Sequence, residues 1–109
     1  MVKPVVGDVI VVLFPFSDLR GGKRRPALIV VEAEFGNLIL CQITSKPYTS
    51  HTAIELAHKD FSDGSLPIVS YVRPDKLFTA DPRIISHHLG AITPKKKGQI
   101  LRSLRNLFK

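Results

Sequence analysis

Short hydrophobic runs alternate with polar turns along most of the chain. The first run, residues 9–14, is β-branched and continuous, which predicts a strand buried on both faces. Comparable runs between Pro, Gly, Asn and Asp residues predict strands at 26–31, 38–43, 53–56 and 68–72, and one more short strand across 84–85 and 88–92. Many short strands with frequent turns favour a small barrel or a strongly twisted sheet.

Polar segments separate these runs. Loops or turns are predicted at residues 17–25, 45–50 and 60–67. Phe35-Gly36-Asn37 is typical of a hairpin turn, in which Asn37 tolerates a positive φ.

The last segment has a helical period instead. Thr93 fits an N-cap and Pro94 fits the first turn of a helix. Apolar residues then recur at helical spacing, at Ile100, Leu101, Leu104, Leu107 and Phe108. We therefore expect a single mainly β domain over residues 1–109, closed by a helix with one apolar side and one basic side.

Composition narrows the class of protein. A chain of 109 residues with 44% hydrophobic residues is expected to be globular, and no apolar stretch is long enough to span a bilayer. The N-terminal residues do not have the shape of a signal peptide. The single cysteine, Cys41, lies in an apolar run and has no partner for an internal disulfide, which favours a reducing cytoplasm.

The positive charge is concentrated in two segments. The formal net charge is +7, residues 17–25 carry four cations and one anion, and residues 93–109 carry six cations and no anion. Such patches attract polyanions or an acidic protein partner. A solvated helix face with a basic tail is the alternative explanation for the second segment.

Several kinds of site have no support in the sequence. The four histidines are scattered, and His87 and His88 would point to opposite faces of a strand, so they cannot bind one metal ion together. A phosphate-cradling glycine signature and a serine elbow motif are both missing from the sequence. We expect neither a metal nor a cofactor.

Polar residues at the ends of predicted strands suggest a different chemistry. Arg25 precedes one strand, Thr44 and Ser45 follow another, and Arg73 and Asp75 follow a third. Two arginines, hydroxyls and a carboxylate suit metal-free cleavage of a phosphodiester, which needs a base, an acid and cations for the developing charge. RNA supplies its own 2′-hydroxyl nucleophile, whereas DNA does not, so the set points toward RNA.

Five blocks of residues, in order, resemble the MazF/PemK toxin family and cover nearly the whole chain. They are Gly7-Asp8-Val9-Ile10-Val11-Val12 with Phe14-Pro15-Phe16, Lys23-Arg24-Arg25-Pro26-Ala27-Leu28-Ile29-Val30, Gln42-Ile43-Thr44-Ser45-Lys46, Ser70-Tyr71-Val72-Arg73-Pro74-Asp75-Lys76-Leu77, and Leu89-Gly90-Ala91-Ile92.

The resemblance implies a mainly β fold with a C-terminal helix, a small SH3-like (CcdB/MazF-type) barrel of five to seven strands. It also implies a homodimeric toxin of a type II toxin–antitoxin system. Members of the family are metal-independent endoribonucleases that cut single-stranded RNA at short sequences and leave a 2′,3′-cyclic phosphate and a 5′-hydroxyl. An acidic antitoxin covers the RNA groove.

The resemblance also implies roles for particular residues. Arg25 would stabilise charge on the phosphate and could protonate the leaving oxygen, while Thr44 would orient the phosphate. Arg73 and Asp75 fall in a block that some members use for catalysis. RNA contacts are expected from Phe16, Arg20, Lys23, Arg24, Ser45, Lys46 and Lys76.

The sequence departs from the family at two places. No histidine occurs in residues 16–24, where some members carry one. Lys76 and Phe78 stand where many members have a glutamine and an arginine.

Structural alternatives stay open for the candidate catalytic residues. Arg25 could pair with Asp18, Thr44 could satisfy backbone donors, and Asp75 could pair locally with Arg73 or Lys76. Two alternative functions also stay open: a non-catalytic toxin of the same fold that inhibits DNA gyrase, or a degenerate member that binds RNA or its antitoxin only.

Overall fold

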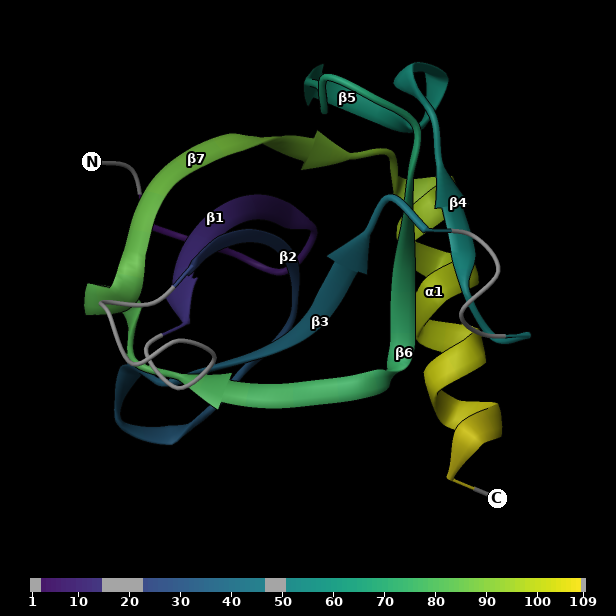
Figure 1. The fold of residues 1–109 in the computed structure, drawn as a ribbon. Helices are drawn as coiled ribbons and strands as arrows, with labels where there is room; N and C mark the ends of the chain where they lie inside the picture. Colours follow the sequence, from purple (N-terminus) through teal and green to yellow (C-terminus); the bar gives the residue numbers. More distant parts are fainter. Residues whose placement is uncertain (1–2, 15–22, 47–50, 109) are drawn as a thin grey trace.

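The computed structural model describes residues 3–14, 23–46 and 51–108. Within these residues, antiparallel strands form one curled sheet in the order β4-β6-β3-β2-β1-β7-β5, and a single α-helix packs against it (Figure 1). The elements are β1 (Asp8–Phe14), β2 (Lys23–Glu32), β3 (Leu38–Thr44), β4 (Ile54–Leu56), β5 (Phe61–Gly64), β6 (Ser70–Ala80), β7 (Ile85–Ile92) and α1 (Pro94–Leu107). This half-barrel confirms the predicted fold class.

The central strands β1 and β2 follow the hydrophobic pattern closely. Both form where the sequence places β-branched runs, and they pair with each other from Val9 opposite Leu28 to Phe14 opposite Lys23. The expectation that β1 is buried on both faces is correct only for its first half, because Leu13 is 40% exposed. The basic end of β2 lies beside that exposed end of β1.

Strand β6 is much longer than the predicted strand at 68–72. It runs for 11 residues and continues past Pro74, and the strand bends sharply along its length (Figure 1). On β3, Cys41 faces Leu77 whereas the next residue, Gln42, faces Arg73, so residues 74–76 form a bulge without partners on β3. A proline is tolerated at a bulge because no ladder hydrogen bond is required there.

One other prediction is wrong for a related reason. The turn expected at 60–67 contains β5, which pairs with β7 despite its polar sequence. The strand expected across 84–85 and 88–92 is present as β7, which begins at Ile85 and also includes Ser86 and His87, and both His87 and His88 pair with β1. Tertiary pairing overrides the weak local preference of these polar residues for strand structure.

The turn between β2 and β3 lies where the sequence predicts, but the left-handed residues are not the expected Asn37. A short 3-10 helix covers Glu34–Gly36, and the positive φ values fall on Phe35 (60°) and Gly36 (76°). Asn37 has an extended conformation with φ of −67°. The Phe35 side chain is 95% exposed, so no contact with the core compensates for its left-handed backbone.

The buried side chains form two clusters on opposite faces of the sheet. The larger one includes Val9, Leu28, Ile43 and Val72 and also takes in the helix. The smaller one lies on the other face and consists of Ile10, Val12, Ala27, Ile29, Leu38, Leu40 and Ala80. Cys41 belongs to the larger cluster, and burial raises the pKa of its thiol to about 12, helped by the negative charge of Asp75. The thiol is therefore protonated and structural.

Helix α1 begins where the sequence predicts. The Thr93 hydroxyl accepts a hydrogen bond from the Lys96 amide at 3.2 Å, and Pro94 occupies the first turn. Ile100 and Leu104 are buried against the sheet. Leu107 and Phe108, which the helical period places in the apolar side, are 41% and 71% exposed, so the packed part of the helix is shorter than predicted. In the described part of the chain, no helix has the length and apolar character to cross a membrane.

Candidate functional site

A pocket of about 530 Å³ opens where β1, β2, β3 and β7 meet the segment that precedes β6. Five of the residues predicted to contact RNA or catalyse its cleavage line this pocket: Arg24, Arg25, Thr44, Ser45 and Lys46. They come from the first residues of β2 and from the end of β3, which are neighbours because the two strands are antiparallel. The sheet therefore brings residues 24–25 and 44–46 together, as the strand-end argument requires.

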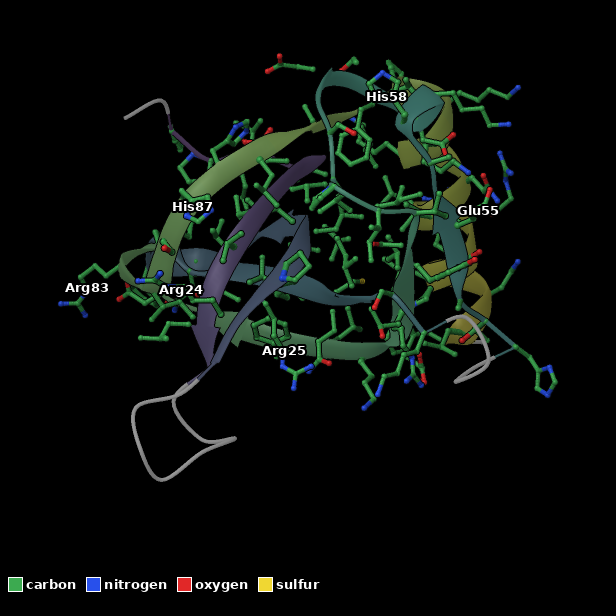
Figure 2. The ribbon with its side chains drawn as sticks, turned by 45° about the horizontal axis from the view of Figure 1, so that its top comes forward. Arg24, Arg25, Glu55, His58, Arg83 and His87 are labelled. Atoms are coloured by element: carbon green, nitrogen blue, oxygen red, sulfur yellow. The ribbon has the colours of Figure 1, made fainter. Side chains whose placement is uncertain are left out.

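Arg24 and Arg25 leave β2 on opposite faces. Arg24 pairs with the exposed Leu13, whereas Arg25 pairs with the fully buried Val12. Side chains alternate between the two faces of a strand, and Figure 2 shows the two arginines pointing in different directions. Both border the pocket because it lies at the strand ends, where either face can be reached from solvent.

The face that carries Arg25 also carries Thr44. The β2–β3 ladder ends where Ala27 lies opposite Gln42. Arg25 and Thr44 each lie two residues beyond that pair, so alternation puts them on the same face as Ala27 and Gln42, and both line the pocket. We call this surface the Arg25 face, and it consists of Arg25, Ala27, Gln42, Thr44, Tyr71 and Arg73.

The Thr44 hydroxyl is oriented by the backbone. Its Oγ1 accepts a hydrogen bond from the Lys46 amide at 3.1 Å. A hydroxyl has one proton and two lone pairs, so this bond leaves the proton free to be donated. The interaction is the backbone role anticipated for Thr44.

Arg73 and Asp75 form a bidentate ion pair at the bulge of β6. Arg73 Nη2 donates to Asp75 Oδ2 at 2.8 Å and Nε donates to Oδ1 at 3.3 Å. The hydrogen bond from Arg73 is the main reason that the pKa of Asp75 lies below its usual range. Arg73 lies opposite Gln42 on the Arg25 face, and neither member of the pair lines the pocket.

His87 lines the pocket although the sequence reasoning did not select it. It pairs with Val11, and Val11 pairs with Pro26 on the other side of β1, so these three residues share one face of the sheet. Figure 2 shows His87 and Arg24 on the same side of the molecule. His88 has the opposite orientation and approaches Asp8, with Nε2 3.5 Å from Oδ1. Only the register of β7 distinguishes the two histidines.

Not every residue predicted to contact RNA belongs to the described part of the chain or to the pocket lining. Phe16, Arg20 and Asp18, the alternative partner of Arg25, lie outside the described residues, as does the side chain of Lys23. Lys76 is exposed on the β6 bulge, away from the pocket lining. Among residues 3–14, 23–46 and 51–108, no group of three or more His, Cys, Asp or Glu residues could hold a metal ion.

Comparison with known proteins gives a family and a fold. The family of PemK-like, MazF-like toxins of type II toxin–antitoxin systems matches residues 6–108. No curated protein sequence matches the chain significantly.

Three solved structures illustrate the fold. The chain is similar to MazF from Deinococcus radiodurans, with a TM-score of 0.75, 22% identity, and coverage of 99% of this chain and 98% of that one. A MazE–MazF complex from the same organism gives a TM-score of 0.77 at 20% identity, over 97% and 96% of the chains. A mycobacterial endoribonuclease in complex with its cognate antitoxin gives 0.71 at 23% identity, over 99% and 95%.

Proposed function

The chain belongs to the family of PemK-like, MazF-like toxins of type II toxin–antitoxin systems, and from that premise we propose that it is an endoribonuclease toxin. Its substrate is single-stranded RNA, which it cuts at short sequences without a metal ion, in the cytoplasm. The observation that carries the proposal is that Arg25 and Thr44, from the neighbouring strands β2 and β3, line the same pocket.

The Arg25 face supplies the groups for attack by the 2′-hydroxyl. The 2′-oxygen bonds to phosphorus and the bond from phosphorus to the 5′-oxygen breaks, which leaves a 2′,3′-cyclic phosphate and a 5′-hydroxyl. The Arg25 guanidinium stabilises the charge on the phosphorane, because it is exposed and forms no ion pair with a carboxylate of the described residues. Thr44 donates its hydroxyl proton to a phosphate oxygen.

Asp75 and Arg25 transfer the protons. Asp75, whose pKa Arg73 holds below its usual range, is ionised at neutral pH and accepts the proton of the 2′-hydroxyl. Arg25 donates a proton to the departing 5′-oxygen. Arg73 holds the Asp75 carboxylate in place through the two hydrogen bonds between them.

The proposal includes two protein partners. The net charge of +7 complements both RNA and an acidic antitoxin. Two of the solved structures are toxins bound to antitoxins, which supports an antitoxin partner here. We also propose that the toxin is a homodimer, as its family resemblance implies.

One assay tests the activity directly. The purified protein is incubated with a long RNA in excess EDTA, and the 5′ ends of the products are mapped. Discrete cuts that leave 5′-hydroxyl groups are expected. Intact RNA accompanied by DNA breaks in the presence of gyrase would instead show a gyrase inhibitor, and RNA that is retarded in a gel but uncut would show a member that only binds.

A further inference from the structure

The pocket has a second face, opposite the Arg25 face, that the proposed reaction does not use. We call it the Arg24 face, and it consists of Val11, Arg24, Pro26, Ile43, His87 and Leu89. Its floor is apolar, because Val11, Pro26 and Ile43 occupy neighbouring positions on adjacent strands. Leu66 and Ile68 from the segment before β6 add further apolar wall.

Polar groups surround this apolar floor. Arg24 stands on one side of β1 and His87 on the other, while Ser70 enters from β6. His87 Nδ1 lies 3.1 Å from Ser86 Oγ, so Nε2 is the ring nitrogen that remains for a ligand. An apolar surface with one guanidinium and one imidazole at its margin matches the chemistry of a nucleotide, which has an aromatic base and an anionic phosphate.

The pocket is also in the right place for a nucleotide. Arg24 and Arg25 are consecutive, and consecutive Cα atoms are about 3.8 Å apart, so the Arg24 face begins one residue away from the proposed cleavage site. The volume of about 530 Å³ lies within the range of pockets that bind small molecules. An RNA whose phosphate contacts Arg25 can therefore pass around the first residues of β2 and place an adjoining nucleotide on the Arg24 face.

We propose that the Arg24 face is a nucleotide subsite in which the apolar floor receives the base, Arg24 contacts the phosphate and His87 hydrogen-bonds to the base edge. The subsite rests on the proposed ribonuclease function and supplies what that function lacks, a structural origin for sequence selectivity. His87 is a specificity-determining residue rather than a catalytic one. The ligand of this subsite is RNA, because the margin of the Arg24 face carries the positive charge of Arg24 and adjoins the proposed cleavage site.

The test separates binding from cleavage. Each of the four 5′-nucleoside monophosphates is titrated into the isotope-labelled protein, and the methyl signals of Ile43, Ile68 and Leu89 are followed by NMR. We expect saturable shifts that are larger for one or two of the bases. His87→Ala should weaken that binding about tenfold, the loss of about one hydrogen bond to the base. Monophosphates that leave these signals unchanged would overturn the subsite.

Two further variants keep the result interpretable. His88→Ala changes the neighbouring histidine on the opposite face of β7 and should bind nucleotides like the wild type. Ile68→Ala removes an apolar wall residue that is 60% exposed, so it should weaken binding without unfolding the protein. Equal binding by wild type, His87→Ala and Ile68→Ala would overturn the assignment even if monophosphates bind elsewhere.

RNA cleavage gives the second readout. The distribution of bases next to the cut should broaden in His87→Ala, while His88→Ala should keep the wild-type distribution. RNA that is cut with an unchanged distribution by His87→Ala overturns the subsite and leaves the nuclease intact. Monophosphate binding in a protein that never cuts RNA supports the subsite and overturns the nuclease. Pocket shifts caused by an acidic peptide and not by monophosphates would assign this face to a protein partner.

Discussion

Arg25 and Arg73 lie on the same face of the same sheet, but only Arg73 forms an ion pair with a carboxylate of the described residues. Arg73 donates two hydrogen bonds to Asp75, and its side chain is only 13% exposed. Arg25 is exposed and has no carboxylate partner in the described part of the chain. The comparison shows that position on a face does not make an arginine available for phosphate: the charge must also be uncompensated.

The largest effect should come from removing the uncompensated arginine. Arg25→Ala should lower the rate of RNA cleavage about 100- to 1,000-fold, because a group that stabilises the transition-state charge is lost. Thermal melting should change little, since the side chain is exposed. Arg83→Ala is the matched control, because Arg83 is exposed and pairs with Asp81 outside the pocket lining. Similar rates for the two variants would remove Arg25 from the site.

Breaking the ion pair should have the next largest effect. Asp75→Asn removes the proposed base, and general bases contribute about 100- to 10,000-fold. The lowered pKa of Asp75 makes it a weak base, so we expect a loss near the lower limit. The rate of RNA cleavage is measured under single-turnover conditions. If Asp75 only neutralises the charge of Arg73, the substitution would make that arginine available for phosphate, and the cleavage rate would be unchanged or higher.

Thr44→Val should have a smaller effect, because it removes one hydrogen bond to the phosphate while keeping the shape of the side chain. The expected loss is about tenfold in cleavage rate. Thr79→Val, an exposed threonine on β6, provides the control for replacing a strand threonine. A rate equal to that of the control would mean that Thr44 serves the backbone amide of Lys46 only.

The smallest effect is the contribution of the Arg73–Asp75 pair to stability. The folded-state pKa of Asp75 is lowered, so the pair stabilises the protein above the unfolded pKa and loses this contribution as pH falls through the folded value. The carboxyl is about one third exposed, which limits the effect to about 1 kcal/mol or less. Thermal melts of wild type and Asp75→Asn should differ slightly at pH 7, and the difference should shrink steadily as the pH is lowered into the acid range. A difference that does not change with pH would have another cause.

The hydrophobic pattern predicts the elements whose own sequences strongly favour strand or helix structure. The runs at β1, β2 and β3 and the capped helix carry strong local signals, and all four elements appear close to their predicted positions. β5 and the second half of β6 have polar or proline-containing sequences. They become strands through pairing with distant partners, which no local pattern encodes.

The candidate site also contains residues whose placement the sequence predicts and one whose placement depends on strand pairing. Arg25 and Thr44 lie at the ends of clear strands, so antiparallel pairing was enough to predict that they meet. The orientation of Arg24 away from Arg25 follows from alternation alone once β2 is known to begin at Lys23. The role of His87 depends on the register between β1 and β7, which includes two irregularities, and this could not be derived from the sequence.

The most direct test of the account is a double-mutant cycle on the rate of RNA cleavage in excess EDTA. If Arg25 and Thr44 act on one phosphate, their effects should be strongly non-additive. The rate of Arg25→Ala/Thr44→Val should then lie within about threefold of the rate of Arg25→Ala alone. Losses that multiply fully, or an Arg25→Ala variant that cuts RNA at the wild-type rate, would contradict a shared site.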